Sequence, residues 1–297
     1  MKTRIDDIAL VVAGESHTAR ARRNYLIFAI VAVTIGWLGV ALDEATGAPP
    51  GDSIGMGLWI VVPAITALLL HRLRPDGGGS LGLTLRFPDR ARWFALAATF
   101  YAPFTAIVVL AGIAAGVASF RTDPGGATTG LLAAVATAVP ALFVKNILEE
   151  LIWRGYGTPT ALATGIPRLW SHVLVGVTWG LWHLPLYAVF MTRADFRATT
   201  SLGMPLFLVL FFAGVIATAV IYGELRLRTG SIWPGVVLHT IGGAIVGPLL
   251  LDGYVRFEGH ADAFFSPAPN SIASVILLGL VGLVLVRRPS SAFGRTG

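Results

Sequence analysis

Long apolar runs alternate with short polar segments along almost the whole chain. A helix that crosses about 30 Å of hydrocarbon needs roughly 20 largely apolar residues, and eight runs approach that length. The third run is longer than one span needs, so we expect it to tilt or to break at Pro103. The pattern predicts an all-α, polytopic membrane protein with about eight transmembrane helices. We place these helices at residues 25–42, 54–70, 93–120, 130–148, 172–190, 202–222, 232–251 and 271–286.

The composition agrees with a membrane protein. Of the 297 residues, 55% are hydrophobic and 13% are charged, whereas soluble domains carry about 25% charged residues. The mean hydropathy is +0.74. The chain contains no cysteine, which excludes disulfides, thiolate catalysis and cysteine-ligated metal. No repeat of fixed period is present, so we expect one membrane domain.

Lysine and arginine are unevenly distributed between the two sides of the predicted bundle. Of the 22 such residues, 17 fall in the two tails and in the loops on the side of the N-terminus, and Lys145 lies inside the fourth run. Only Arg121, Arg193, Arg197 and Arg256 fall on the other side. Positive residues concentrate in cytoplasmic segments, so we expect both termini to be cytoplasmic, in the cell (plasma) membrane.

This topology also predicts the domain limits and the partners. Residues 1–24 form a cytoplasmic tail, residues 25–288 the membrane domain, and residues 289–297 a second tail. Anionic lipid headgroups attract basic loops, so the net charge of +6 indicates membrane lipids as partners and no nucleic acid.

Two adjacent carboxylates, Glu149 and Glu150, follow the apolar run 130–148. A charge in a span costs roughly 2.5 to 3.5 kcal/mol even on insertion scales, so the pair needs a partner or a function. In a helix, Arg154 lies one turn after Glu150 and can form an ion pair with it. Glu149 then points about 100° away. We expect it to be unpaired and able to act as a general base. The alternative is a helix-end cluster solvated at the membrane interface.

Two histidines lie inside later apolar runs. His183 follows Trp179 by one helical turn, so the indole can pack against the imidazole and orient it. His239 lies about two turns into the run that begins after Ser231. A single buried histidine is more often a hydrogen-bonded core residue than a catalyst, and neither position indicates chemistry by itself.

Taken together, the order Glu-Glu-x-x-x-Arg, aromatic-x-x-x-His and a further His resembles the CPBP family of intramembrane endopeptidases, also called the Abi or CAAX-protease-like family. It includes the enzymes that process prenylated CAAX proteins. The resemblance covers a core of about 130–251. It implies that Glu149 activates a water with help from His183, that His239 stabilises the tetrahedral intermediate, and that Glu150 and Arg154 hold the site together.

The last motif of the family is His-x-x-x-Asn or His-x-x-x-Asp, and this chain has Gly243 at its final position. In the family that side chain is thought to help hold the oxyanion. Loss of one such donor costs on the order of 10² to 10³ in rate. Gly243 therefore predicts a slow enzyme, a rearranged oxyanion site, or a protein without hydrolytic activity.

The resemblance also implies a substrate and leaves the metal question open. We expect a membrane-associated peptide or protein substrate, such as a prenylated CAAX protein, and a site that opens towards the cytoplasm. We favour no cofactor. The alternative is a zinc ion held by Glu149, His183 and His239 with a water.

Two other classes of protein remain open. One is a non-catalytic membrane scaffold or bacteriocin-immunity-type protein of the same fold. The other is a transporter, although no pair of matching interrupted helices is found in two halves of the chain.

Overall fold

The computed structural model describes residues 2–49, 53–73, 78–87, 89–122 and 130–288. The C-terminal tail expected at 289–297 lies outside the described residues. The α-helices are α1 (Lys2–Thr46), α2 (Ile54–Leu73), α3 (Ala91–Thr99), α4 (Tyr101–Ala114), α5 (Leu131–Glu150), α6 (Thr158–Ala163), α7 (Arg168–Trp182), α8 (Arg193–Thr199), α9 (Met204–Thr229), α10 (Trp233–Leu251), α11 (Asp262–Phe265) and α12 (Ile272–Arg287). Two π-helical segments, η1 (Leu151–Gly157) and η2 (Leu186–Phe190), interrupt them. The strands β1 (Ala118–Phe120) and β2 (Val255–Phe257) form one short antiparallel pair, in which Ser119 faces Arg256.

The predicted all-α membrane fold is confirmed. Within the described residues, seven helical runs are long and apolar enough to cross a membrane. The expected eighth span is α12, which is apolar but only 16 residues long. The third run is interrupted at Phe100, between α3 and α4. Pro103 explains this break, because a proline has no N–H to bond the carbonyl four residues earlier and its ring crowds that carbonyl.

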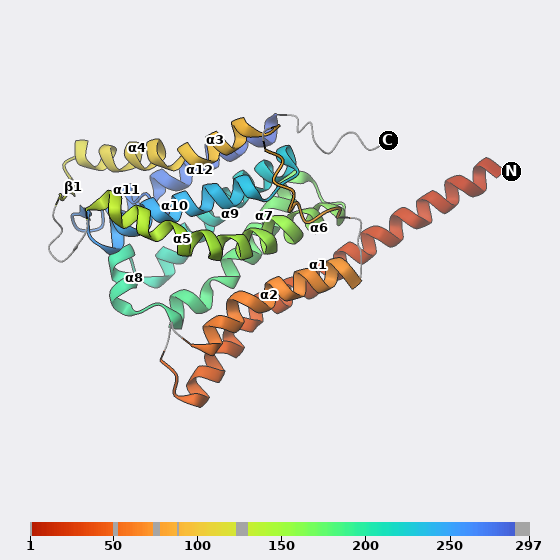
Figure 1. Ribbon diagram of the computed structural model, residues 1–297, viewed down its shortest axis with the longest axis horizontal. Coiled ribbons are helices and arrows are strands. Elements are labelled where there is room, and N and C mark those ends of the chain that lie inside the picture. Colours follow the sequence, from red (N-terminus) through yellow and green to blue (C-terminus); the bar gives the residue numbers. More distant parts are fainter. Residues whose placement is uncertain (1, 50–52, 74–77, 88, 123–129, 289–297) are drawn as a thin grey trace.

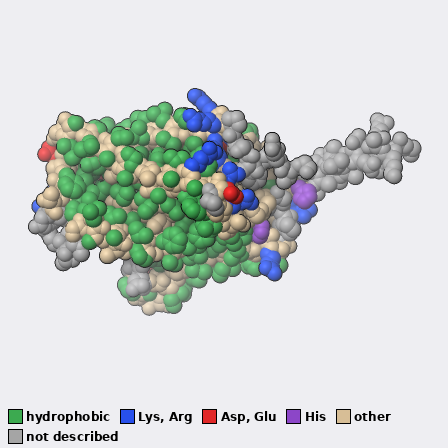
Figure 2. All heavy atoms as spheres, turned by 45° about the horizontal axis from the view of Figure 1, so that its top comes forward, with side chains coloured by type: hydrophobic (Ala, Val, Ile, Leu, Met, Phe, Trp, Pro, Cys, Tyr) green, Lys and Arg blue, Asp and Glu red, His purple; other side chains and the backbone are tan. Residues whose placement is uncertain are grey.

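The helices form a bundle with a broad apolar side surface. α5 packs against α10, both α7 and α12 pack against α9, and α1 packs against α2. Residues 2–24, expected as a tail, belong to α1, whose N-terminal part extends beyond the bundle (Figure 1). Leu110, Val144 and Val209 are among many large apolar side chains exposed on the outer faces. The face drawn in Figure 2 is largely apolar, with arginines and lysines gathered towards the end from which α1 extends.

Both π-helical segments directly follow predicted motifs. η1 begins after Glu150, and η2 begins soon after His183. Pro159 and Pro185 lack the N–H that would continue an α-helical ladder. At the end of η1, the Trp153 carbonyl accepts from the backbone N–H of Thr158 and from its hydroxyl, the latter at 3.0 Å. Wide turns of this kind are frequent at functional sites. They also continue the helix, so the two glutamates lie within the run Leu131–Ala163 and not at its end.

Candidate active site

Glu150 and Arg154 form the predicted ion pair inside the bundle. Arg154 Nη1 lies 3.3 Å from Glu150 Oε1, and the two residues are 1% and 0% exposed. The guanidinium carbon lies 4.2 Å from the centre of the Trp179 ring and 4.6 Å from that of Tyr222. Two aromatic faces therefore stabilise a cation that has little water around it. The alternative of a solvated cluster at a helix end is wrong, because both carboxylates are buried.

The expectation that Glu149 is unpaired is also wrong. The Lys145 ammonium contacts Glu149 Oε1 from one helical turn earlier, and the Trp179 indole N–H donates to Oε2 at 3.3 Å. A carboxylate buried to this degree needs such partners, because an isolated buried charge is very costly. Lys145 lies inside a predicted span, four residues before Glu149. That spacing is the signal in the sequence that identifies the pair.

Each of the two histidines uses its Nδ1 atom within the protein. His239 Nδ1 lies 3.1 Å from Glu150 Oε1, and His183 Nδ1 lies 2.8 Å from the Trp179 carbonyl oxygen. The Trp179 ring packs between them, with ring centres 5.7 Å from His183 and 5.6 Å from His239. Trp179 thus orients His183 as expected, and Nε2 is the nitrogen that each imidazole can present to a substrate.

A cavity of about 260 Å³ lies beside these rings. Its lining combines residues from the predicted motifs with residues of α4, η2, α9, α10 and the segment between α11 and α12: Tyr101, Trp179, His183, Tyr187, Phe211, Val215, Thr218, Tyr222, His239, Gly242, Gly243, Val246, Gly247, Pro267 and Pro269. Glu149 is not part of this lining. It accepts a hydrogen bond from the indole of Trp179, which lines the cavity and whose ring packs beside both imidazoles. The structure therefore brings together Glu149, His183 and His239 from α5, the end of α7, and α10.

Two glycines of α10 bear on the site. Gly235 allows a close approach to Glu150, and Gly243 leaves the cavity without a side chain at the position where the family has Asn or Asp. A Cβ atom on Gly235 would lie 2.6 Å from Glu150 Oε2, so only glycine lets α10 approach that carboxylate. Gly243 faces the cavity, and a Cβ there would lie 3.3 Å from Leu142 Cδ1. Three residues before Gly243 on α10, Thr240 Oγ1 accepts a hydrogen bond from Asn146 Nδ2 of α5, at 3.3 Å. Position 243 itself offers no side-chain donor to an oxyanion.

Of the side chains proposed as zinc ligands, Glu149 is paired with Lys145. The Nδ1 atoms of His183 and His239 are held by the Trp179 carbonyl and by Glu150, which leaves both Nε2 atoms free, as in histidines that bind a metal. Among the residues that the structure describes, no three His, Cys, Asp or Glu side chains form a group that could hold a metal ion. The three side chains are therefore not arranged as a zinc site of three protein ligands, and the metal-free reaction stays a prediction.

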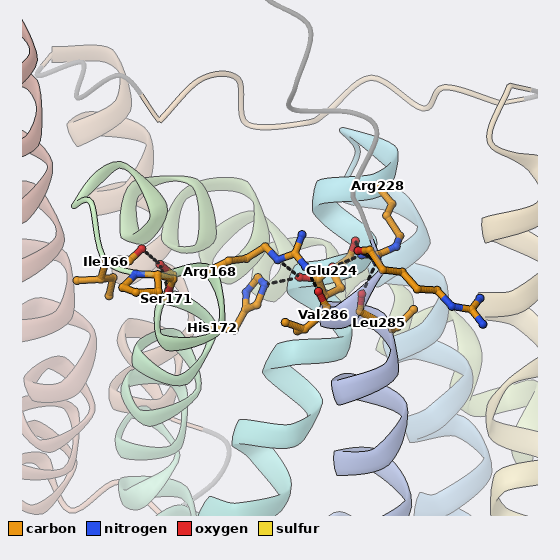
Figure 3. A network of polar contacts seen from close by, with 10 residues as sticks. Ile166, Arg168, Ser171, His172, Glu224, Arg228, Leu285 and Val286 are labelled. Atoms are coloured by element: carbon orange, nitrogen blue, oxygen red, sulfur yellow. Dashed lines mark hydrogen bonds and ion pairs between the residues drawn. The ribbon is translucent and has the colours of Figure 1, made fainter.

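A second buried charge cluster, which the sequence did not reveal, lies between α7, α9 and α12 (Figure 3). Glu224 Oε1 accepts from Arg168 Nε and lies 3.1 Å from His172 Nε2, while Arg228 contacts Oε2. Arg228 and Arg168 also donate to the carbonyls of Leu285 and Val286 at the end of α12. The last carbonyls of a helix lack the N–H partners of the preceding turns, and here the arginines bond them in addition to the Arg288 N–H that donates to Leu285. This cluster therefore fixes the end of α12 and is separate from the cavity.

The comparison with known proteins bears on the region that builds the cavity. No curated protein matches the sequence. Residues 131–245 match the family described as type II CAAX prenyl endopeptidase Rce1-like. This segment begins with α5 and contains Glu149, Arg154, Trp179, His183 and His239. It agrees with the resemblance to the CPBP family seen in the sequence. The segment of this membrane protein that builds the cavity, residues 131–245, is therefore similar to the Rce1-like type II CAAX prenyl endopeptidases.

Proposed function

We propose that this protein is an intramembrane endopeptidase that hydrolyses peptide bonds of membrane-associated substrates with a water activated by Glu149. One observation carries the proposal. His183 and His239 line one cavity within the bundle, and Glu149 lies directly behind Trp179, the lining residue whose ring packs beside both imidazoles. Carboxylates and histidines are rare in spanning helices and mark functional sites there. The Rce1-like match supports the same reaction class.

The residues suit a hydrolysis in which water is the nucleophile. Glu149 removes a proton from the water as the water oxygen attacks the carbonyl carbon of the substrate peptide bond. His183 helps to hold that water. The carbonyl oxygen becomes an oxyanion, which His239 stabilises through Nε2. Glu149 then passes its proton to the amine as the C–N bond breaks. Proton transfer of this kind contributes about 10² to 10⁴ in rate.

Glu150, Arg154 and Trp179 serve as positioning residues in this scheme. Glu150 holds His239 Nδ1, and Arg154 neutralises Glu150. Trp179 supplies its carbonyl to His183 and its indole N–H to Glu149. Hydrogen bonds behind a reacting group fix its orientation, and an error of about 1 Å costs on the order of 10² in rate. No step requires a metal ion.

The test is cleavage of a library of membrane-associated peptides, with and without a prenyl group, by the purified protein in lipid. Wild type is compared with Glu149→Gln, His183→Ala and the control Glu258→Gln, which changes an exposed carboxylate outside the cavity. We expect cleavage by wild type and the control, and a loss of at least about 10² in the two site variants. If no peptide is cleaved in a way that depends on Glu149, the non-catalytic scaffold is the better interpretation.

A further inference from the structure

The cavity extends from the histidines towards one end of the bundle. Along α10 it passes from His239 through Gly243 to Gly247, which is about 12 Å at 1.5 Å per residue. Along α9 it passes from Tyr222 back to Phe211. The short turn between these helices makes them run in opposite directions, so both walls lead to the same end. This is the end that carries β1, α8 and α11 (Figure 1).

The segment between α11 and α12 forms the far wall of the cavity. Pro267 and Pro269 both line it. The Pro269 carbonyl packs so closely on α9 that a Cβ atom on Gly214 would lie 1.6 Å from its oxygen. The Ser266 carbonyl accepts a hydrogen bond from the Ser271 hydroxyl at 2.6 Å. These contacts hold the segment between α11 and α12 in place as a wall of the cavity.

Segment 78–87 covers the opposite end of the site. The Ile232 N–H donates to the Gly82 carbonyl at 2.9 Å, and the Trp233 indole N–H donates to the Leu83 carbonyl at 2.7 Å. Leu81 packs on the buried cluster formed by Leu151, Ile232 and Val236. These residues surround the start of α10, six residues before His239, and none of them lines the cavity. The site is thus covered on this side.

The covered end is the arginine-rich end of the molecule. Its segments contain Arg72, Arg86, Arg90, Arg92, Arg168, Arg226, Arg228 and Arg287, whereas the end reached by the cavity contains Arg121, Arg193, Arg197 and Arg256. Arginines and lysines concentrate in the short segments on the cytoplasmic side of a membrane. The cavity therefore extends away from the predicted cytoplasmic side, opposite to the direction expected from the sequence.

We propose that substrate reaches this site from the extracytoplasmic side, and that it is an internal apolar segment of an exported or membrane-inserted polypeptide. This proposal rests on the proposed function. The described residues that line the cavity include no Lys, Arg, Asp or Glu, so a peptide with uncharged side chains suits it. They also provide no lysine or arginine to receive the carboxylate of a chain terminus. At about 260 Å³, the cavity lies slightly below the usual range of ligand sites, which begins at about 300 Å³, so it suits a short stretch of chain.

The natural absence of cysteine allows a direct test of the access side. Single cysteines are placed at Gly247 in the cavity, where a Cβ meets no atom within 4 Å, at Thr84 on the covered end, and at exposed Glu258 on the other end. The matched control is Ala244→Cys, on the same helix but fully buried outside the cavity. A small, charged, membrane-impermeant methanethiosulfonate is applied to spheroplasts and to inverted membrane vesicles.

We expect Gly247→Cys and Glu258→Cys to be modified in spheroplasts, Thr84→Cys only in inverted vesicles, and Ala244→Cys in neither. Modification of Gly247→Cys only in inverted vesicles, or from neither side, would overturn the proposal. So would modification of Glu258→Cys from the cytoplasmic side. Labelling needs no catalysis, so this result is independent of the cleavage test for the proposed function. If wild type cleaves peptides while Gly247→Cys is labelled only from the cytoplasm, the access side alone is wrong.

Discussion

Replacement of Arg154 by methionine tests whether the Glu150–Arg154 pair is a structural unit. The substitution keeps a long side chain but removes the charge that lies 3.3 Å from Glu150 Oε1. It leaves a carboxylate that is 0% exposed, with only His239 Nδ1 as a remaining hydrogen-bond partner among the described residues. The fold then has to hold an uncompensated buried charge.

The magnitude follows from the burial of both partners. Removing one partner of a buried ion pair costs about 3 to 5 kcal/mol, whereas replacing both by apolar residues is often close to neutral. We therefore expect Arg154→Met to lower the free energy of unfolding by about 3 to 5 kcal/mol. The double variant Glu150→Leu/Arg154→Met should recover most of that loss. The coupling energy of the cycle should reach at least about 2 kcal/mol, within the range measured for contacting residues.

Unfolding is followed by tryptophan fluorescence during titration of mixed micelles with a denaturing detergent. The control is Arg256→Met in β2, where the side chain is exposed and surface substitutions change stability by about 0.5 kcal/mol or less. A loss in Arg154→Met no larger than in this control would refute the argument, as would additive effects in the double variant. The double variant should remain poor in cleavage even when stable, because His239 has then lost its Glu150 partner.

Two further tests concern Lys145, the partner of the reacting carboxylate, and position 243, where the family has an oxyanion donor. Lys145→Met should lower kcat on the order of 10²-fold, because Glu149 loses the cation that holds it. KM should change little, and Lys145→Arg should restore much of the rate. Steady-state kinetics of Lys145→Met equal to those of wild type would contradict this role. The second test combines Gly243→Asn with Leu142→Ala, because a Cβ at position 243 would meet the Leu142 side chain. If the missing oxyanion donor limits the rate, this double variant should raise kcat by up to about 10²-fold. A stable double variant with no gain over Leu142→Ala would show that position 243 needs no donor.

The sequence predicted most of what depends on local geometry. The apolar runs correspond to the helices of the structure, and the spacing of Glu150 and Arg154 predicted their ion pair. The same spacing rule applied to Lys145 and Glu149. That pair was missed because Lys145 was counted only with the charges that set orientation. The break near Pro103 was also predictable, because it follows from the covalent structure of proline.

Contacts between distant parts of the chain were not predictable in the same way. The His239–Glu150 contact joins residues 89 positions apart, and the Trp179–Glu149 bond joins residues 30 apart. Both depend on how α5, α7 and α10 pack. The Glu224 cluster illustrates the same limit, since its partners come from α7 and α9 and its arginines cap α12. Sequence spacing within one helix contains no information on which neighbouring helix a side chain will meet.

The two adjacent glutamates differ in the exposure of their cations, and this difference assigns their roles. Each carboxylate has a basic residue four positions away, but in opposite directions along the helix. Arg154 is 1% exposed and packed between two aromatic rings, so the cation beside Glu150 is held in one position. The Lys145 side chain is 39% exposed and contacts only one oxygen of Glu149. A general base must gain and release a proton in each cycle. A flexible, partly exposed lysine can adjust to that change of charge, whereas a buried arginine cannot, so Glu149 is the carboxylate suited to catalysis and Glu150 the one suited to structure.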